Sequence, residues 1–544
     1  MKYIILFIAI TITYGCRQVE PKVQATPYSA INETDSIKDF REFKVLDSKH
    51  INNKNLWQPF ENDLKDFNNE TYMRLKPLII EKDIPTIQQS IYNGALTYEN
   101  LVKFYLYRIR TFDRENKLSL NAVISLNPNV IAEARQNDRD LRNRKLKHPI
   151  FGMPILVKDN INVKAMPTTA GAVALLENYA NDAFIIQRLK SAGALILGKA
   201  NLSEWAYFFC GDCPSGYSAV GGQTLNPYGR RSMDTGGSSS GSGVAVAANF
   251  CVAALGSETS GSILSPSSQN SVVGLKPTIG LVSRRGIVPI SSTLDTAGPM
   301  AKNVTDTAIV LDAIYGYDDK DSKSINTEIT GHYYNLMDNN ALIGKRFGAV
   351  KRLLEDTLYV NAISHLKSKG TIIVEIQEEK IDLPDFLRLL NLDMKTDLKA
   401  YLKQYVGNKV TVKSVQDVID FNRKDSVNTM AYGQRLFLGI VKDTATTEEF
   451  NNLKLVLNTN GRNFFDTVFK AHDLDGFLSV NNYHASYAAV AEYPAITVPM
   501  GYNEDGIPKG LTFIGKPFSE KNLLQWAYAY ETVSRNRMSP INYN

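Results

Sequence analysis

One lysine and two groups of serines are the side chains of this sequence that could do covalent chemistry together. Lys158 ends the apolar run ILV at residues 155–157, and the serines lie in TGGSSSGSG at 235–243 and GSETSGSI at 256–263. A lysine at the end of a buried strand is costly while charged, and a neutral lysine is a base. A serine hydroxyl becomes a nucleophile when a base takes its proton. These residue types therefore indicate acyl-transfer chemistry.

The position of Lys158 allows two interpretations. An isolated lysine by default lays its stem along apolar surface and keeps its ammonium group in water. Here Asp159 and Asn160 follow at once and offer polar partners. We therefore favour a buried lysine at the end of a strand.

The two serine groups enclose a short apolar segment. Residues 244–248 (VAVAA) predict a small-residue helix, and residues 251–255 (CVAAL) a buried strand. Flexible Gly/Ser linkers would not contain such a segment. We expect two tight loops held against each other, because glycine permits backbone geometry that other residues resist and serine hydroxyls can sit close to a substrate. Residues 234–278 thus form the centre around which the chain is organised.

A second nucleophile is conceivable in the same stretch. Residues 237–241 match G-x-S-x-G, the nucleophile elbow in which Ser239 would act with a late histidine, either His472 or His484. That motif requires a strand before the serine, and RRSMD at 230–234 does not resemble one. A histidine-assisted serine esterase is therefore the minority hypothesis.

Metal and nucleotide chemistry find no support in the sequence. The six histidines include no H-E-x-x-H, which argues against a zinc hydrolase. Residues 193–199 imitate a phosphate-binding loop, but Ala200 replaces the required Ser or Thr and the residues between are strand-like. No metal or organic cofactor is expected.

The composition is that of an ordinary soluble globular protein. The chain has 544 residues, of which 44% are hydrophobic and 22% charged, and a net charge of +5. It has no dense Lys/Arg block, so nucleic-acid binding is not indicated. The length alone is a weak guide to the number of domains.

The N-terminus predicts export. Lys2 precedes an apolar run at residues 4–10 that is too short to span a bilayer but fits a signal peptide covering residues 1–16. Gly15-Cys16 resembles a bacterial lipobox, in which Cys16 would be lipidated, although Thr13 and Tyr14 are unusual there. The alternative is a buried N-terminal helix or strand. We expect a periplasmic or lipid-anchored protein that meets the membrane only through Cys16.

Residues 17–76 are expected to form a polar tether and an N-terminal extension, because the first part is polar and lacks periodicity. Farther on, Cys210 and Cys213 form a C-x-x-C without a second pair, which does not complete a zinc site; in an exported protein the two could form a small local disulfide. Cys251 is expected to pack as a small apolar residue.

From residue 77 to 540 the pattern is that of a single α/β domain with a mixed central sheet. A helical, charged insertion at about 318–470 could cover the site. Strands are expected at 122–126, 155–157, 194–198, 251–255, 475–480, 493–501 and 510–515, and helices after the N-cap Thr97 and at 130–144, 183–192 and 521–534.

Several motifs taken together resemble the amidase signature family. They are GMP at 152–154 with Lys158, GGSS at 236–239, TSGSI at 259–263, VGLKPT at 273–278, DTAGPM at 295–300 and the closing PAITVPMG at 494–501. LSEWA at 202–206, GGQTLNPY at 221–228 and GLVSR at 280–284 are most similar to bacterial peptide amidases.

The resemblance implies a triad of Ser, cis-Ser and Lys. It places the nucleophile on Ser262, the bridging serine on Ser238 after a cis peptide bond, and the base on Lys158. The turn Thr259-Ser260-Gly261 would point backbone N–H groups at the oxyanion, and Ser239 would support the lysine and Ser238.

The resemblance implies hydrolysis of a carboxamide, with peptide or small-molecule amides as substrates. Within the same fold, the amidotransferase subunit that supplies ammonia for tRNA-bound glutamate is an alternative, against which the export signal argues. A catalytically silent binding lipoprotein is a third hypothesis, and the presence of all three triad residues argues against it.

Overall fold

A computed structural model describes residues 43–114, 116–143, 148–326 and 332–544. The expected signal peptide, Cys16 and the tether as far as residue 42 lie outside these residues. Within the described part of the chain, no helix is long and apolar enough to cross a membrane.

The strands of the main sheet agree with the expected α/β pattern. They are β1 (Val123–Leu126), β2 (Pro154–Lys158), β3 (Leu195–Ala200), β6 (Ala253–Glu258), β7 (Val273–Lys276), β8 (Thr296–Ala301), β9 (Arg346–Val350), β10 (Ile372–Ile376), β11 (Gly476–Val480), β12 (Ala495–Tyr502) and β13 (Pro508–Ile514). In the described residues these eleven strands form one sheet in the order β1-β3-β2-β6-β8-β7-β12-β13-β11-β9-β10. The predicted single domain with a mixed central sheet is confirmed.

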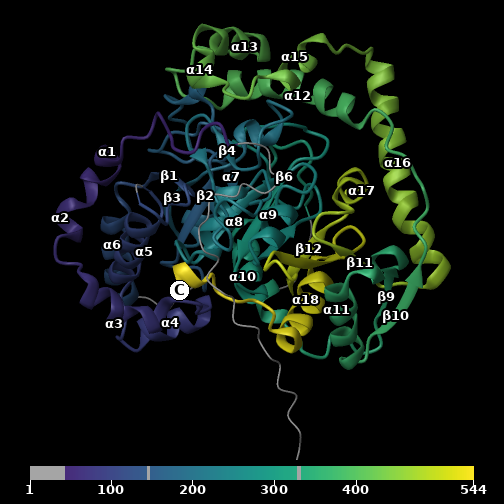
Figure 1. Cartoon of the computed structure of the whole chain (residues 1–544), viewed down its shortest axis with the longest axis horizontal. Coiled ribbons are helices and arrows are strands. Elements are labelled where there is room, and N and C mark those ends of the chain that lie inside the picture. The colour runs from purple at the N-terminus through teal and green to yellow at the C-terminus, as the bar shows by residue number, and fades with distance from the viewer. Residues whose placement is uncertain (1–42, 115, 144–147, 327–331) are drawn as a thin grey trace, which may run out of the picture. The chain divides into compact units, whose positions relative to one another are not determined.

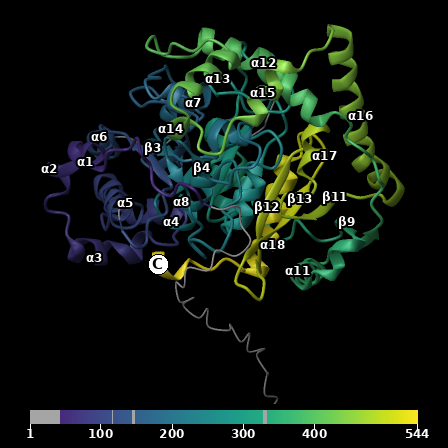
Figure 2. The same ribbon diagram turned by 45° about the horizontal axis from the view of Figure 1, so that its top comes forward.

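The centre of the sheet carries the catalytic candidates. β2 lies between β3 and β6 and runs parallel to both, with Val157 opposite Leu255. Every residue of β2, β3 and β6 is buried, as expected for parallel strands that are covered on both faces. β12, β13 and β11 lie side by side in Figure 2, and β9 and β10 complete that edge.

The helices cover both faces of the sheet and form the insertion. Those before residue 320 are α1 (Asn53–Trp57), α2 (Glu61–Leu64), α3 (Asn69–Ile79), α4 (Ile84–Tyr92), α5 (Tyr98–Phe112), α6 (Val130–Asn143), α7 (Phe184–Ser191), α8 (Ser240–Ala247), α9 (Leu264–Gln269) and α10 (Val304–Ile314). The later ones are α11 (Thr357–Ser368), α12 (Phe386–Gln404), α13 (Val415–Lys424), α14 (Ser426–Thr429), α15 (Arg435–Lys442), α16 (Thr447–His472), α17 (Ala485–Val490) and α18 (Glu520–Ser534).

The Gly/Ser stretch folds into two loops around one buried helix. Every residue of α8 is buried, and the helix packs against β6, β2 and α9. Gly236 has φ +63, and a Cβ there would lie 2.7 Å from the backbone nitrogen of Pro266. Only glycine allows the loop before α8 to come this close to α9, the helix that follows the second serine group.

The segment before residue 80 is attached to the domain. Residues 43–52, which the sequence analysis places in the tether, make a β-bridge between Asp47 and Gly222, and the Ser48 hydroxyl donates to the Val220 carbonyl at 2.5 Å. In the following helices, Phe60 and Leu75 are buried in the main core. The C-terminus returns to the same region, where the Tyr543 hydroxyl donates to the Leu118 carbonyl at 2.7 Å (Figure 1).

The region expected to be a helical insertion has two parts. β9, α11 and β10 extend the main sheet, whereas the helices from α12 to α16 form a second hydrophobic cluster with residues near Trp205 and Phe209. Figure 1 shows α12–α15 gathered on one side of the sheet and α16 running back toward β9 and β10. The Cys210–Cys213 disulfide belongs to this cluster, and Cys251 is a buried free thiol in the main core.

Candidate active site

Lys158 ends β2 with a fully buried side chain. Its Nζ donates to the Ser238 hydroxyl at 2.8 Å, to the Ser257 hydroxyl at 2.9 Å and to the Ser257 carbonyl at 3.1 Å. Burial lowers the pKa of Lys158 to about 7, while the charges of Asp295 and Glu258 oppose that shift. A lysine with such a pKa can exchange a proton with its serine neighbour near neutral pH.

Ser238 is buried and follows a cis peptide bond after Gly237. Its hydroxyl accepts a hydrogen bond from Lys158. The next residue, Ser239, donates its backbone N–H to the Ser262 carbonyl at 3.1 Å. This contact joins the two serine loops and brings the backbone of Ser262 against the residue that follows Ser238.

Ser262 is partly exposed and stands just before α9. Its hydroxyl has no hydrogen-bond partner among the described residues. The preceding Gly261 has φ +86, and in the described part of the chain the backbone N–H groups of Thr259, Ser260 and Gly261 have no acceptor. This turn therefore combines an available hydroxyl with N–H groups that could meet an oxyanion.

Ser257 is the residue near the lysine that sequence reasoning missed. Its hydroxyl accepts hydrogen bonds from Lys158 and from the Asn160 side-chain amide, the latter at 2.9 Å. Ser239 donates its hydroxyl to the Ser257 carbonyl at 3.0 Å. Ser239 thus supports the lysine through Ser257 and makes no direct contact with it. The signal that could have found Ser257 is its place in the Gly-Ser-Glu sequence at 256–258. This sequence ends β6, the strand that pairs with the strand of Lys158.

Asp159 does not partner Lys158, contrary to the expectation from their adjacency. Its carboxylate pairs with Lys199 at 3.0 Å, and both side chains are buried. Lys199 also donates to the Ile161 carbonyl and the Thr168 hydroxyl, each at 2.8 Å. The lysine of the loop at 193–199 is therefore fully engaged in the core.

Glu258 holds the start of α9 behind Ser262. Its Oε2 accepts the backbone N–H groups of Ile263 at 2.7 Å and Leu264 at 3.0 Å. These N–H groups at a helix start have no intrahelical partner, and a carboxylate there is favourable. Glu258 therefore fixes the orientation of the turn that carries Ser262.

The arrangement disfavours the histidine-assisted elbow. Ser239 is fully buried and its hydroxyl is bonded to the backbone of Ser257. His484 contacts Ser479 at 2.6 Å through Nδ1 and Glu378 through Nε2. His472 ends α16, which packs on β9 and β11. In the described part of the chain the Ser239 hydroxyl bonds to Ser257 and to neither histidine.

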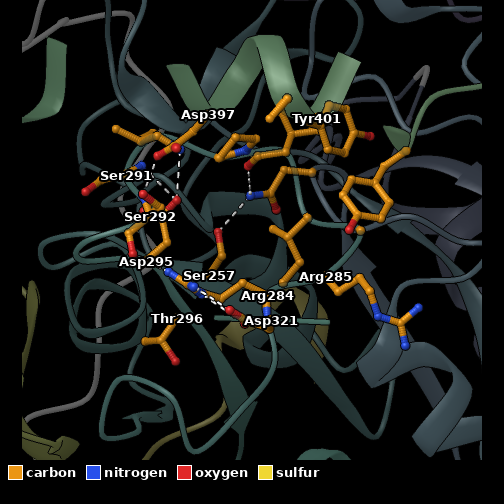
Figure 3. Close-up of a pocket in the computed structure, with 18 of the residues that line it drawn as sticks. Ser257, Arg284, Arg285, Ser291, Ser292, Asp295, Thr296, Asp321, Asp397 and Tyr401 are labelled. Carbon is orange, nitrogen blue, oxygen red and sulfur yellow. Dashed lines mark hydrogen bonds and ion pairs between the residues drawn. The ribbon is translucent and has the colours of Figure 1, made fainter. Parts of the chain in front are cut away.

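A cavity of about 240 Å³ reaches Ser257, the serine whose hydroxyl contacts Lys158. Asn160, Ser257 and Thr259 line it, together with residues 284–292 and part of α12. Figure 3 shows Ser257 between Asp397 and Tyr401 on one side and the Arg284–Asp321 pair on the other. The insertion therefore supplies part of the wall beside the catalytic candidates.

Known proteins match this chain over most of its length. The family described as Amidase matches residues 100–479. A probable amidase of Arabidopsis thaliana is 38% identical over 481 residues, covering 85% of this chain and 92% of the relative. An amidase family protein from Bacillus anthracis is 38% identical with a TM-score of 0.86, covering 91% of this chain and 99% of that one. The native peptide amidase of Stenotrophomonas maltophilia is 39% identical with a TM-score of 0.81, covering 85% and 98%.

The fold and these matches define an enzyme that hydrolyses amide C–N bonds. The chain belongs to the amidase signature family, as its motifs predicted.

Proposed function

We propose that the protein hydrolyses carboxamides through an acyl-enzyme on Ser262, with Ser238 as the bridging serine and Lys158 as the base. The observation that carries this proposal is the fully buried Lys158, whose Nζ lies 2.8 Å from the Ser238 hydroxyl and whose pKa burial lowers to about 7. A second serine, Ser262, stands beside this pair with an available hydroxyl.

In the forward step, neutral Lys158 takes the Ser238 proton while Ser238 takes the proton of Ser262. The Ser262 oxygen bonds to the amide carbon, and the turn at 259–261 receives the oxyanion. The C–N bond then breaks as the nitrogen receives the proton returned from Lys158 through Ser238, and ammonia or an amine leaves. Water attacks the resulting ester by the same proton path, and the carboxylic acid departs.

C-terminal peptide amides are the substrates we propose. Support comes from the similarity to the peptide amidase of Stenotrophomonas maltophilia. A lined cavity beside the lysine offers room for an acyl group larger than a simple acetyl. We propose no cofactor and no nucleic-acid partner.

The test is labelling of the full-length protein with a fluorophosphonate, followed by peptide mapping and release of ammonia from a C-terminal peptide amide. We expect labelling on Ser262 that is lost in Lys158→Ala, and turnover that is lost in Ser262→Ala and Ser238→Ala. Labelling on Ser239, or loss of turnover in Ser239→Ala alone, would replace this mechanism with the histidine-assisted one. A folded protein that neither labels nor releases ammonia would favour the binding lipoprotein.

We also propose that the protein is exported and anchored through Cys16. The apolar run at 4–10 and the Gly15-Cys16 pair support this proposal, and a disulfide at Cys210–Cys213 suits an oxidising compartment. Mass spectrometry of the mature N-terminus in a bacterial host tests it. A lipid mass on Cys16 that disappears in Cys16→Ser is expected, and retention of residues 1–15 would refute it.

A further inference from the structure

The cavity beside Lys158 opens from the buried site toward the surface. Asn160 and Ser257, which line its inner part, are 2% and 8% exposed, whereas Lys320, Ser322 and Ala400 in its lining are exposed. Thr259, in the same turn as Ser262, also lines it. The cavity thus leads from solvent to the residues around the proposed nucleophile.

This cavity suits the acyl part of a substrate. In the proposed reaction on a primary amide, the leaving group is ammonia, which is far too small to fill about 240 Å³. The group that the cavity selects therefore belongs to the part of the amide that stays on Ser262. This step rests on the proposed function.

The cations of the cavity wall are already paired. Arg284 donates to both carboxylate oxygens of Asp321, with Nε at 3.0 Å from Oδ2. Arg285 pairs with Asp318 at 2.7 Å, and its guanidinium points away from Ser257 in Figure 3. Lys320 is exposed at the outer end, where solvent and salt screen its charge.

Two carboxylates of the wall, Asp295 and Asp397, make no ion pair in the described residues, although the charge of Arg284 reaches both. Asp295 accepts hydrogen bonds from the Thr259 hydroxyl and from two backbone N–H groups, and Asp397 accepts one from the Ser292 N–H at 2.5 Å. Their neighbour Asp393 differs, since it pairs with Lys454 at 3.3 Å.

An independent acceptor lines the same cavity. Asn160 donates its side-chain amide to the Ser257 hydroxyl and, at 3.5 Å, toward the Val288 carbonyl, which can only accept. This fixes which end of the amide is the oxygen. That oxygen, Oδ1, is buried and has no hydrogen-bond partner among the described residues. A buried acceptor without a donor is unfavourable, so a donor-rich ligand group would satisfy it.

We propose that this cavity binds a positively charged nitrogen, an ammonium or guanidinium group, on the acyl part of the amide substrate. Asp295 and Asp397 would receive the charge and Asn160 Oδ1 one of its N–H groups. Charge-assisted hydrogen bonds of this kind are stronger than neutral ones. The charged nitrogen could come from a basic side chain or from a free N-terminus, and both present the same chemistry to the wall.

The test compares three amides at pH 7. N-acetyl-norleucinamide is the neutral reference, N-acetyl-lysinamide adds a side-chain ammonium, and norleucinamide with a free amine adds a terminal one. We expect wild-type kcat/KM for at least one cationic amide to exceed that of the reference by roughly tenfold. Which one does so identifies the source of the charge.

Asp397→Asn is the informative variant, because asparagine removes the charge and keeps one acceptor oxygen for the Ser292 N–H. It should reduce the ratio of cationic to neutral kcat/KM by roughly tenfold. Asp420→Asn is the matched control, since Asp420 is an exposed acid of α13 outside the cavity, and it should keep the wild-type ratio. A wild-type ratio of one or less for both cationic amides, or a ratio that Asp397→Asn leaves unchanged, would overturn the inference.

Calorimetric titration of Ser262→Ala with the same amides separates this inference from the proposed mechanism. Tighter binding of a cationic amide, lost when Asp397→Asn is added, supports the cavity whatever the nucleophile is. Equal Kd values for cationic and neutral amides would refute the cavity assignment. Turnover that survives in Ser262→Ala would instead refute the mechanism and leave the charge preference to be judged from the Kd values.

Discussion

The pH dependence of Lys158 gives the sharpest test of the mechanism. Burial lowers the pKa of this lysine to about 7, against the opposing charges of Asp295 and Glu258. If the neutral amine is the base, roughly one molecule in eleven is active at pH 6 and roughly ten in eleven at pH 8. The kcat/KM of an uncharged substrate such as N-acetyl-norleucinamide should therefore rise roughly tenfold over this interval.

Removal of one charge should move this profile in a known direction. Asp295 raises the pKa of Lys158, so Asp295→Asn should shift the midpoint to lower pH. Because Asp295 also accepts three hydrogen bonds, the readout is the midpoint and not the maximal rate. Asp397→Asn is the control, since Asp397 is not among the charges that shift Lys158, and its midpoint should match the wild type.

The assay is ammonia release at substrate concentrations well below KM, from pH 5 to 9 at constant ionic strength. A kcat/KM that is independent of pH over this range would refute the assignment of Lys158 as a base with a pKa near 7. A midpoint that is unchanged in Asp295→Asn would refute the effect of the Asp295 charge on the pKa of Lys158. It would not bear on whether Lys158 is the base.

Three further predictions concern the framework of the site. Gly261→Ala should lower kcat/KM by about two orders of magnitude, because Gly261 has φ +86 and a Cβ there would lie 2.9 Å from Asn482 Nδ2. Gly94→Ala is the control, since Gly94 has φ +75 and a Cβ there would have nothing within 4 Å. This variant should keep its activity, and a comparable loss would show that the positive φ alone is responsible. Glu258→Ala should lower the free energy of unfolding by at least about 2 kcal/mol in denaturant titration, because two buried N–H groups lose a charged acceptor; an unchanged midpoint would contradict that role. Denatured without reductant, the protein should show two fewer free thiols than after reduction, owing to Cys210 and Cys213, and equal counts would show that they are not bonded.

Much of the core could be predicted from the sequence because its signals are local. The apolar run before Lys158, the small-residue segment between the serine groups and the cap at Thr97 each report the conformation of neighbouring residues. Thr97 is indeed the N-cap of α5, with its hydroxyl accepting the Asn100 N–H at 3.1 Å. The family motifs then indicated that Lys158, Ser238 and Ser262, which are far apart in the sequence, belong to one site. No local pattern contains this information.

The partners of Lys158 illustrate what local reasoning could not reach. Asp159 was favoured by adjacency, but successive side chains of an extended chain point in opposite directions. It therefore meets Lys199 of β3, while Lys158 meets Ser257 of β6. The parallel register of β2 with β6 decides this contact, and strand order is set by packing across the whole sheet.

The cavity could not be predicted for a related reason. Its wall includes Asp397 and Tyr401 of α12, in a region where the sequence has no family motif and no interpretable signature. The helical character of that region follows from its pattern, but which helix turns toward the site depends on tertiary packing. Asp295 lies within a family motif, yet its contact with the Thr259 hydroxyl is visible only in the fold.

The placement of α12–α16 has a bearing on how such enzymes diversify. This helical segment leaves the sheet after the edge strand β10 and rejoins it at β11, which is separated from β10 by β9. The lysine and the serines are held by β2, β6 and α8. These elements precede the helical segment in the chain and contain none of its residues. Exchange of the segment between homologous enzymes would thus alter the chamber wall and preserve the proton-transfer apparatus. Natural variation and laboratory grafting could both replace this segment. The substrate range could therefore change while the residues of the proposed proton transfer stay the same.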